Sequence, residues 1–79
     1  LNVLDMCYYD QYAVLILMES TIYRVDLQSG YSKLVTYVAD NAKSIHCNNT
    51  FIIIGVSRES GSNSHIEKIL VFDRVSGKL

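Results

Sequence analysis

Hydrophobic residues in this chain fall into short blocks separated by polar residues. Four blocks are rich in β-branched and aromatic residues, are about four to eight residues long and are bounded by Asn, Asp, Ser, Gly or Glu; they cover residues 13–18, 21–27, 51–56 and 68–73. This length, composition and punctuation are typical of β-strands. Weaker blocks at residues 32–38 and 42–47, and a further candidate strand within residues 1–9, complete the pattern. The chain is therefore predicted to be all-β and antiparallel.

The weaker blocks allow finer expectations. In the first candidate strand, Val3 and Met6 are the inward candidates, and Ile45 and Cys47 are expected to share one face of theirs. The one helical alternative covers residues 31–43, where apolar residues recur at helix-like spacing. Thr36, Tyr37 and Val38 favour a strand there, and no capping box precedes the run.

A repeated motif is the most informative feature of the sequence. Residues 22–30 (IYRVDLQSG) align with residues 69–77 (ILVFDRVSG), 47 positions apart, with identities at Ile22/Ile69, Asp26/Asp73, Ser29/Ser76 and Gly30/Gly77. Upstream, residues 12–17 align with residues 51–56 at an offset of 39. Each copy, residues 1–38 and residues 39–79, is predicted to run strand, turn, strand and then an Asp-x-x-Ser-Gly turn. Asp accepts bonds from downstream backbone amides, and Gly supplies a positive φ.

The two copies differ in one turn. The first copy turns tightly through Glu19 and Ser20, whereas the second carries a polar insertion within residues 57–68.

Repeats of this length and order resemble blades of a β-propeller. Residues 51–55, the polar loop after them and residues 69–79 resemble strands two and three of a WD40-like or Kelch-like blade. The chain has no Gly-His or Trp-Asp pair, so the resemblance is to a divergent blade. It implies about two antiparallel blades; a small β-sandwich or an open antiparallel sheet remain as alternatives.

Three of the strand blocks are apolar at consecutive positions, at residues 14–17, 51–54 and 69–72. Such strands need cover on both faces. Propellers use about four to eight blades, and this chain has material for about two. The expected partners are therefore further blades of the same polypeptide or other protein chains, including copies of this chain in a homo-oligomer.

Charge and cysteine content exclude several classes of function. The 79 residues carry a formal net charge of -1 with interspersed charges, so neither nucleic acid nor a membrane is an expected partner. The longest apolar run, residues 13–18, is far too short to span a bilayer. Cys7 and Cys47 make no Cys-x-x-Cys pair, and free thiols in a cytoplasmic protein are favoured over a single bridge.

No constellation for catalysis, cofactor binding or metal binding stands out. Cys7, His46, Cys47 and His65 lack the short paired spacing of structural zinc sites, and a Cys–His–Asp nucleophile using Asp40 has no support in the spacing. His46 is expected to face outward and Cys47 inward. Asp26 and Asp73 are expected to cap turns. The sequence favours a protein that is not an enzyme and has no cofactor.

Candidate interaction residues fall in two places. Tyr8, Tyr9 and Tyr12 cluster beside Asp10, and tyrosine offers a large contact area with a polar tip. The insertion adds Arg58, Glu59 and His65. The alternative for the tyrosines is that they cap the core edge between blades.

These residues give a protein-interaction or scaffold element as the first hypothesis for function. A fragment of a propeller enzyme or ligand sensor, and a small self-associating β-domain, are the alternatives.

Overall fold

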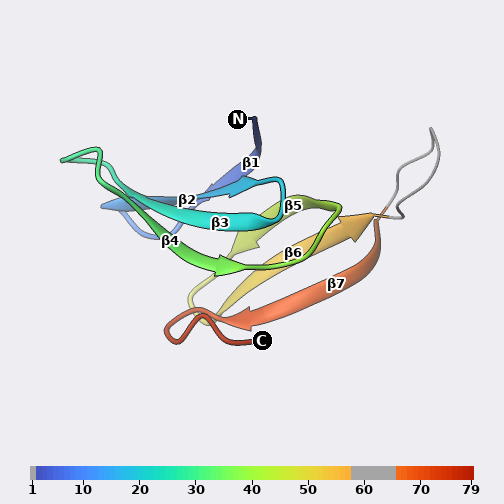
Figure 1. Ribbon diagram of the computed structural model, residues 1–79. Helices are drawn as coiled ribbons and strands as arrows, with labels where there is room; N and C mark the ends of the chain where they lie inside the picture. Colours follow the sequence, from blue (N-terminus) through green and yellow to red (C-terminus); the bar gives the residue numbers. More distant parts are fainter. Residues whose placement is uncertain (1, 58–65) are drawn as a thin grey trace.

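The computed structural model describes residues 2–57 and 66–79, which form seven strands in two antiparallel sheets (Figure 1). The first sheet has the order β1-β2-β3-β4 and the second β5-β6-β7. The strands are β1 (Val3–Tyr8), β2 (Ala13–Met18), β3 (Thr21–Asp26), β4 (Ser32–Tyr37), β5 (Ala42–Cys47), β6 (Phe51–Ser57) and β7 (Ile66–Asp73). Each sheet is a simple meander, because consecutive strands are neighbours. The predicted all-β class is confirmed.

Strand positions follow the hydrophobic blocks closely. The blocks at residues 13–18 and 42–47 coincide with β2 and β5, and β7 begins at Ile66, two residues before its block. The helical alternative over residues 31–43 is wrong, since β4 and β5 occupy this region. Thr36 and Tyr37, which favour a strand, pair with Ile22 and Thr21 of β3, so this segment is part of the first sheet.

The two Asp-x-x-Ser-Gly turns adopt the same conformation. The Asp26 carboxylate accepts bonds from the backbone amides of Gln28 at 2.9 Å and Ser29 at 2.8 Å. Asp73 accepts the amide of Ser76 at 2.8 Å. These amide bonds lower the pKa of both carboxyl groups from the ordinary 3.8. The predicted capping role of the two aspartates is confirmed.

Glycine closes each of these turns. Gly30 has φ 76° and Gly77 has φ 72°, in the left-handed region that side chains disfavour. The amide of each glycine donates to the carbonyl of the aspartate four residues before it, at 2.8 Å in both copies. The tight turn predicted at Glu19 and Ser20 is present too, with Met18 paired to Thr21.

A β-bulge occurs near the start of the first strand of each sheet. In β1 the register shifts between Val3 and Asp5, and in β5 it shifts between Ala42 and Ser44. The bulge places Val3 and Met6 on one face, but that face is exposed, at 53% and 54%. The expectation that these two side chains point inward is therefore wrong. Cys7, from the same strand, packs against the core instead.

The hydrogen-bonded register corrects the repeat alignment by one residue. Ala13 pairs with Asp26 in the first sheet, and Phe51 pairs with Asp73 in the second. Since the two aspartates are equivalent, Ala13 is equivalent to Phe51, an offset of 38 rather than the expected 39. A one-residue shift moves every side chain of a strand to the opposite face. The correction therefore decides which face of each sheet is buried.

The two sheets pack front to back around one core. In the first sheet Leu15, Leu17 and Ile22 face the interface and are almost fully buried. Their repeat equivalents in the second sheet, Ile53, Gly55 and Ile69, lie on the face that points away, as the register with buried Ile52 and Ile54 requires. The backbones of the two sheets approach most closely where β1 and β2 lie against β5. The two sheets thus meet through faces that are not equivalent in the repeat, and we call this arrangement front-to-back.

The close approach of β1 and β5 includes a hydrogen bond between the sheets. The Ile45 amide donates to Asp5 Oδ2 at 2.9 Å. The expected common face of Ile45 and Cys47 is confirmed, since both pack into the core.

Candidate functional site

The face of the first sheet that points away from the second sheet is apolar. Cross-strand register places one row of four side chains on this face, from β1 to β4: Met6, Ile16, Tyr23 and Leu34. Residues directly opposite on antiparallel strands share a face. Met6 and Leu34 are each 54% exposed, and Tyr8 and Tyr37 on the same face are 73% and 58% exposed. We call this surface the first outer face.

A β-bulge in β4 places two of its apolar side chains on the first outer face. The register passes from the Ile22–Thr36 pair to the Tyr23–Leu34 pair, which leaves Val35 as the extra residue. Leu34 and Tyr37 therefore lie on the same side although they are three positions apart. Val35 turns the other way and packs against the core.

The second sheet also has an apolar face that points away from the core, and we call it the second outer face. It carries Phe51, Ile53, Ile69 and Val71, which alternate with buried residues along β6 and β7. Ile69 is 62% exposed, and Phe51 and Val71 are each 42% exposed. Isolated exposed apolar residues are ordinary, but a contiguous apolar face indicates a contact surface.

The three clustered tyrosines differ in their exposure. Tyr8 lies on the first outer face, and Tyr12 in the following turn is 65% exposed. Tyr9 turns inward and packs against the core cluster. Tyr8 and Tyr12 are thus exposed and Tyr9 packs against the core, and the interaction role of these tyrosines stays a prediction.

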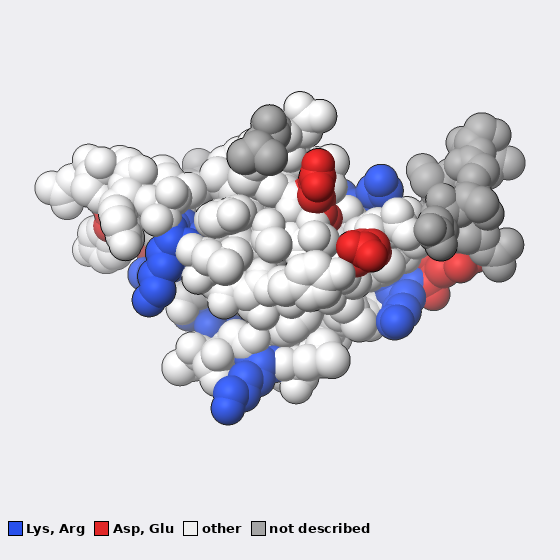
Figure 2. Space-filling model, in the orientation of Figure 1, with Lys and Arg blue, Asp and Glu red and all other residues white. Residues whose placement is uncertain are grey.

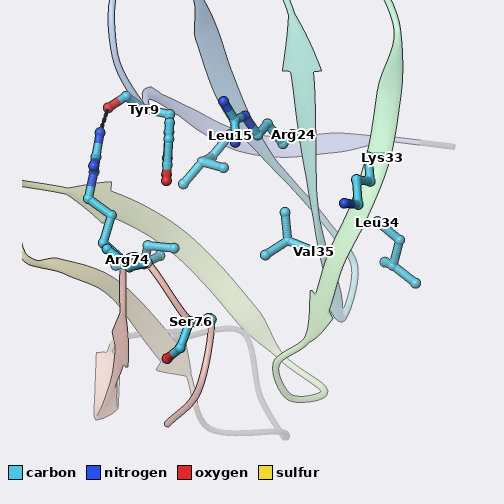
Figure 3. Close-up of a pocket in the computed structure, with 11 residues that line it drawn as sticks. Tyr9, Leu15, Arg24, Lys33, Leu34, Val35, Arg74 and Ser76 are labelled. Atoms are coloured by element: carbon cyan, nitrogen blue, oxygen red, sulfur yellow. Dashed lines mark hydrogen bonds between the residues drawn. The ribbon is translucent and has the colours of Figure 1, made fainter.

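Tyr9 lies between two guanidinium groups in Figure 3. Arg74 Cζ lies 3.9 Å and Arg24 Cζ 4.5 Å from the centre of the Tyr9 ring. Arg74 Nη2 also donates to the Tyr9 carbonyl, which ties the turn after β7 to the turn after β1. The face of an aromatic ring attracts cations, so this contact links the two sheets where the turn after β7 meets the turn after β1. No sequence signal predicted this contact, because the three residues meet only in the fold.

The interaction candidates Arg58, Glu59 and His65 lie outside the residues that the structure describes, as does most of the polar insertion within residues 57–68. Ser57 is the exception: it ends β6 and is buried, and its amide donates to the Asn41 carbonyl at 3.0 Å.

Cysteine chemistry finds no support in the geometry. Cys7 and Cys47 are free and half-buried, and His46 is exposed. Burial raises the pKa of the Cys7 thiol to about 11, and the neighbouring Cys47 and Asp5 act in the same direction. A thiol of this kind is a weak nucleophile at neutral pH. Within residues 2–57 and 66–79, no three Cys, His, Asp or Glu side chains group as metal ligands.

Charged side chains leave most of the visible surface free in Figure 2. Lys and Arg lie at the left, lower and right parts of this view, and acidic side chains lie above and to the right of its centre. Across the described part of the chain, no helix is long and apolar enough to cross a membrane.

Comparison with known proteins finds no matching family model, curated protein or solved structure.

Proposed function

We propose that this chain is a scaffold and protein-interaction element, built as two consecutive blades of a divergent β-propeller. Its two outer faces bind further sheets of the same kind. The expected partners are other blades of the same polypeptide or other protein chains. The half-buried free thiols of Cys7 and Cys47 accord with a cytoplasmic location, which we include in the proposal.

The observation that carries this proposal is the front-to-back order of the two sheets. Ile22 and Ile69 occupy equivalent repeat positions, yet Ile22 is 0% exposed in the interface and Ile69 is 62% exposed. The surface that the first sheet buries is therefore presented again by the second sheet, on its outer face. Heterologous contacts of this kind repeat until a ring closes, or else continue as an open array.

The first outer face supplies the matching half of such a contact. The first paired residue after the bulge is Asp5 in β1 and Ser44 in β5. Met6 and Ile45 come next in their strands, so they are equivalent. Ile45 is 5% exposed against the first sheet, whereas Met6 is 54% exposed. A second outer face docked on Met6 would reproduce the contact already present within the chain.

A small self-associating β-domain predicts a different arrangement. A two-fold dimer would use the same face on both copies, so that one outer face would suffice for association. The alternative of a propeller enzyme is favoured by no observation among the described residues.

The test compares two single variants with their mixture, in sedimentation velocity. Met6→Lys blocks the first outer face and Ile69→Lys blocks the second; both side chains are exposed, so the fold is expected to persist. The unmodified chain should associate as its concentration rises. Each variant alone should be monomeric, and the 1:1 mixture should form a heterodimer through the two intact faces.

Three outcomes would contradict the proposal. An unmodified chain that stays a stably folded monomer with sharp thermal unfolding would show that the outer faces bind nothing of their own kind. Dimerisation of the Ile69→Lys variant alone would indicate a two-fold contact through the first outer face. A mixture that remains monomeric while the unmodified chain assembles would exclude front-to-back pairing.

A further inference from the structure

A groove opens between the two sheets beyond the Tyr9 contact (Figure 3). Its volume is about 190 Å³, and it lies between β3 and β4 on one side and the turn after β7 on the other. Leu15, Val35 and Ile52 give it apolar walls. The charged side chains lining it are all basic: Arg24, Lys33 and Arg74. None of the described residues that line the groove is acidic.

The three basic residues are placed at an electrostatic cost. Arg24 and Lys33 are directly opposite one another on β3 and β4, and like charges in this arrangement destabilise a sheet. Arg74 brings a third positive charge to the other side of the Tyr9 ring. The protein has a net charge of -1 and seven Lys and Arg residues, and three of these seven line this one groove.

Neighbouring groups offset only part of this charge. The Tyr9 ring attracts the two guanidinium groups. The charge of Arg24 helps to lower the pKa of Asp26, but the Asp26 carboxylate is already bonded to the amides of its own turn. Arg74 Nε is buried and has no hydrogen-bond partner among the described residues. A buried donor on a charged group is costly to leave unpaired.

We propose that the groove binds a small tetrahedral dianion of the phosphate class. Two guanidinium groups and one ammonium group favour a doubly charged ligand over a carboxylate, and the planar fork of arginine matches phosphate oxygens. An anion in the groove would relieve the Arg24–Lys33 repulsion and compensate the partly desolvated Arg74. The ligand is either free phosphate or a phosphoryl group carried on another molecule. The three basic residues of the groove belong to neither outer face.

The test is a titration of the complete chain followed by ¹H–¹⁵N NMR at constant ionic strength. The probes are inorganic phosphate, O-phosphoserine, acetate and chloride. Phosphate should cause saturable shifts at the Arg74 Nε–Hε signal and at the amides of Ser76 and Gly77, which line the groove. Saturation by O-phosphoserine as well would point to a carried phosphoryl group, whereas saturation by phosphate alone would point to the free ion.

Matched charge variants separate a site from general attraction. Arg24→Gln and Lys33→Gln each remove one groove cation from an exposed position and should weaken phosphate binding about tenfold. Lys43→Gln removes the same charge from β5, outside the groove, and should leave binding unchanged. Equal weakening by Lys43→Gln, shifts that never saturate, or equal responses to phosphate, acetate and chloride would each overturn the proposal.

Discussion

The first sheet continues past its Asp-x-x-Ser-Gly turn into β4, whereas the second sheet has β7 as its last described strand. The turns themselves match closely. The Asp26 amide donates to the Tyr31 carbonyl at 2.9 Å, and the Asp73 amide donates to the Lys78 carbonyl at 2.7 Å. Leu79 thus reaches the position that Ser32 occupies at the start of β4. The turn reverses the chain through local hydrogen bonds, and it forms in both sheets although a fourth strand follows it only in the first sheet among the described residues.

The two sheets also differ in what covers equivalent residues. The isoleucines that begin the motif, Ile22 and Ile69, are buried and exposed respectively. Sequence identity at a repeat position therefore does not imply the same environment. In a front-to-back stack, environment depends on whether a neighbouring sheet is present on that side.

The largest effect is expected from truncating the buried side of β6. Ile54 is 0% exposed, and Ile54→Ala should lower the free energy of unfolding by about 3 kcal/mol through lost contacts and an unfilled cavity. Ile53→Ala changes the same residue type one position away on the second outer face, and should cost about 1 kcal/mol. Urea unfolding of both variants measures the difference. Equal losses would mean that the two faces of β6 are buried alike.

A smaller and nearly equal effect is expected from the two turn glycines. Gly30→Ala and Gly77→Ala should each cost about 1 kcal/mol, because alanine resists the left-handed conformation. Steric clashes do not contribute, since a Cβ at Gly30 meets nothing within 4 Å and one at Gly77 meets only Val35 Cγ1 at 3.8 Å. Thermal unfolding of the two variants gives the comparison. A neutral Gly77→Ala substitution would show that the second turn is not held in the conformation of the first.

The smallest effect is expected from acid titration of the turn aspartates. Hydrogen bonds from backbone amides lower the pKa of Asp26 and Asp73 below 3.8 in the folded chain. Their stabilising contribution is therefore complete above the unfolded pKa and is lost as the pH falls through the lower folded values. Chemical unfolding between pH 6 and pH 2 should show that an Asp26→Asn, Asp73→Asn double variant loses less stability on acidification. An unchanged pH dependence would contradict the amide bonds.

Much of the fold was predictable because strand and turn signals here are local. Blocks of β-branched residues ended by Asp, Ser and Gly determine β2, β3 and β6 almost to the residue. Which side of each strand is buried could not be predicted in the same way. The bulge in β1 is a backbone irregularity without a residue signature, and the offset of the repeat depends on which residues pair across the strands. Each changes which side of a strand is assigned to the core.

The candidate site was predictable in part. Tyr8 and Tyr12 are exposed, as an interaction role requires, and their exposure follows from strand ends and turns. Tyr9 could not be assigned, because its position depends on Arg24 and Arg74, which belong to different sheets. The apolar outer faces were implied by strands without alternation, but the sequence predicted that both faces would be covered. The structure covers one face of each sheet within the described chain.

The front-to-back order of the sheets is tested most directly by the solvent exposure of Ile22 and Ile69. Methyl signals would be recorded with a soluble gadolinium chelate in the Met6→Lys chain, which is expected to be monomeric because the substitution blocks the first outer face. The Ile69 methyl signals should broaden strongly, and those of Ile22 should be unaffected. Equal protection of the two isoleucines would mean that equivalent faces meet across the interface, and would contradict the front-to-back stack.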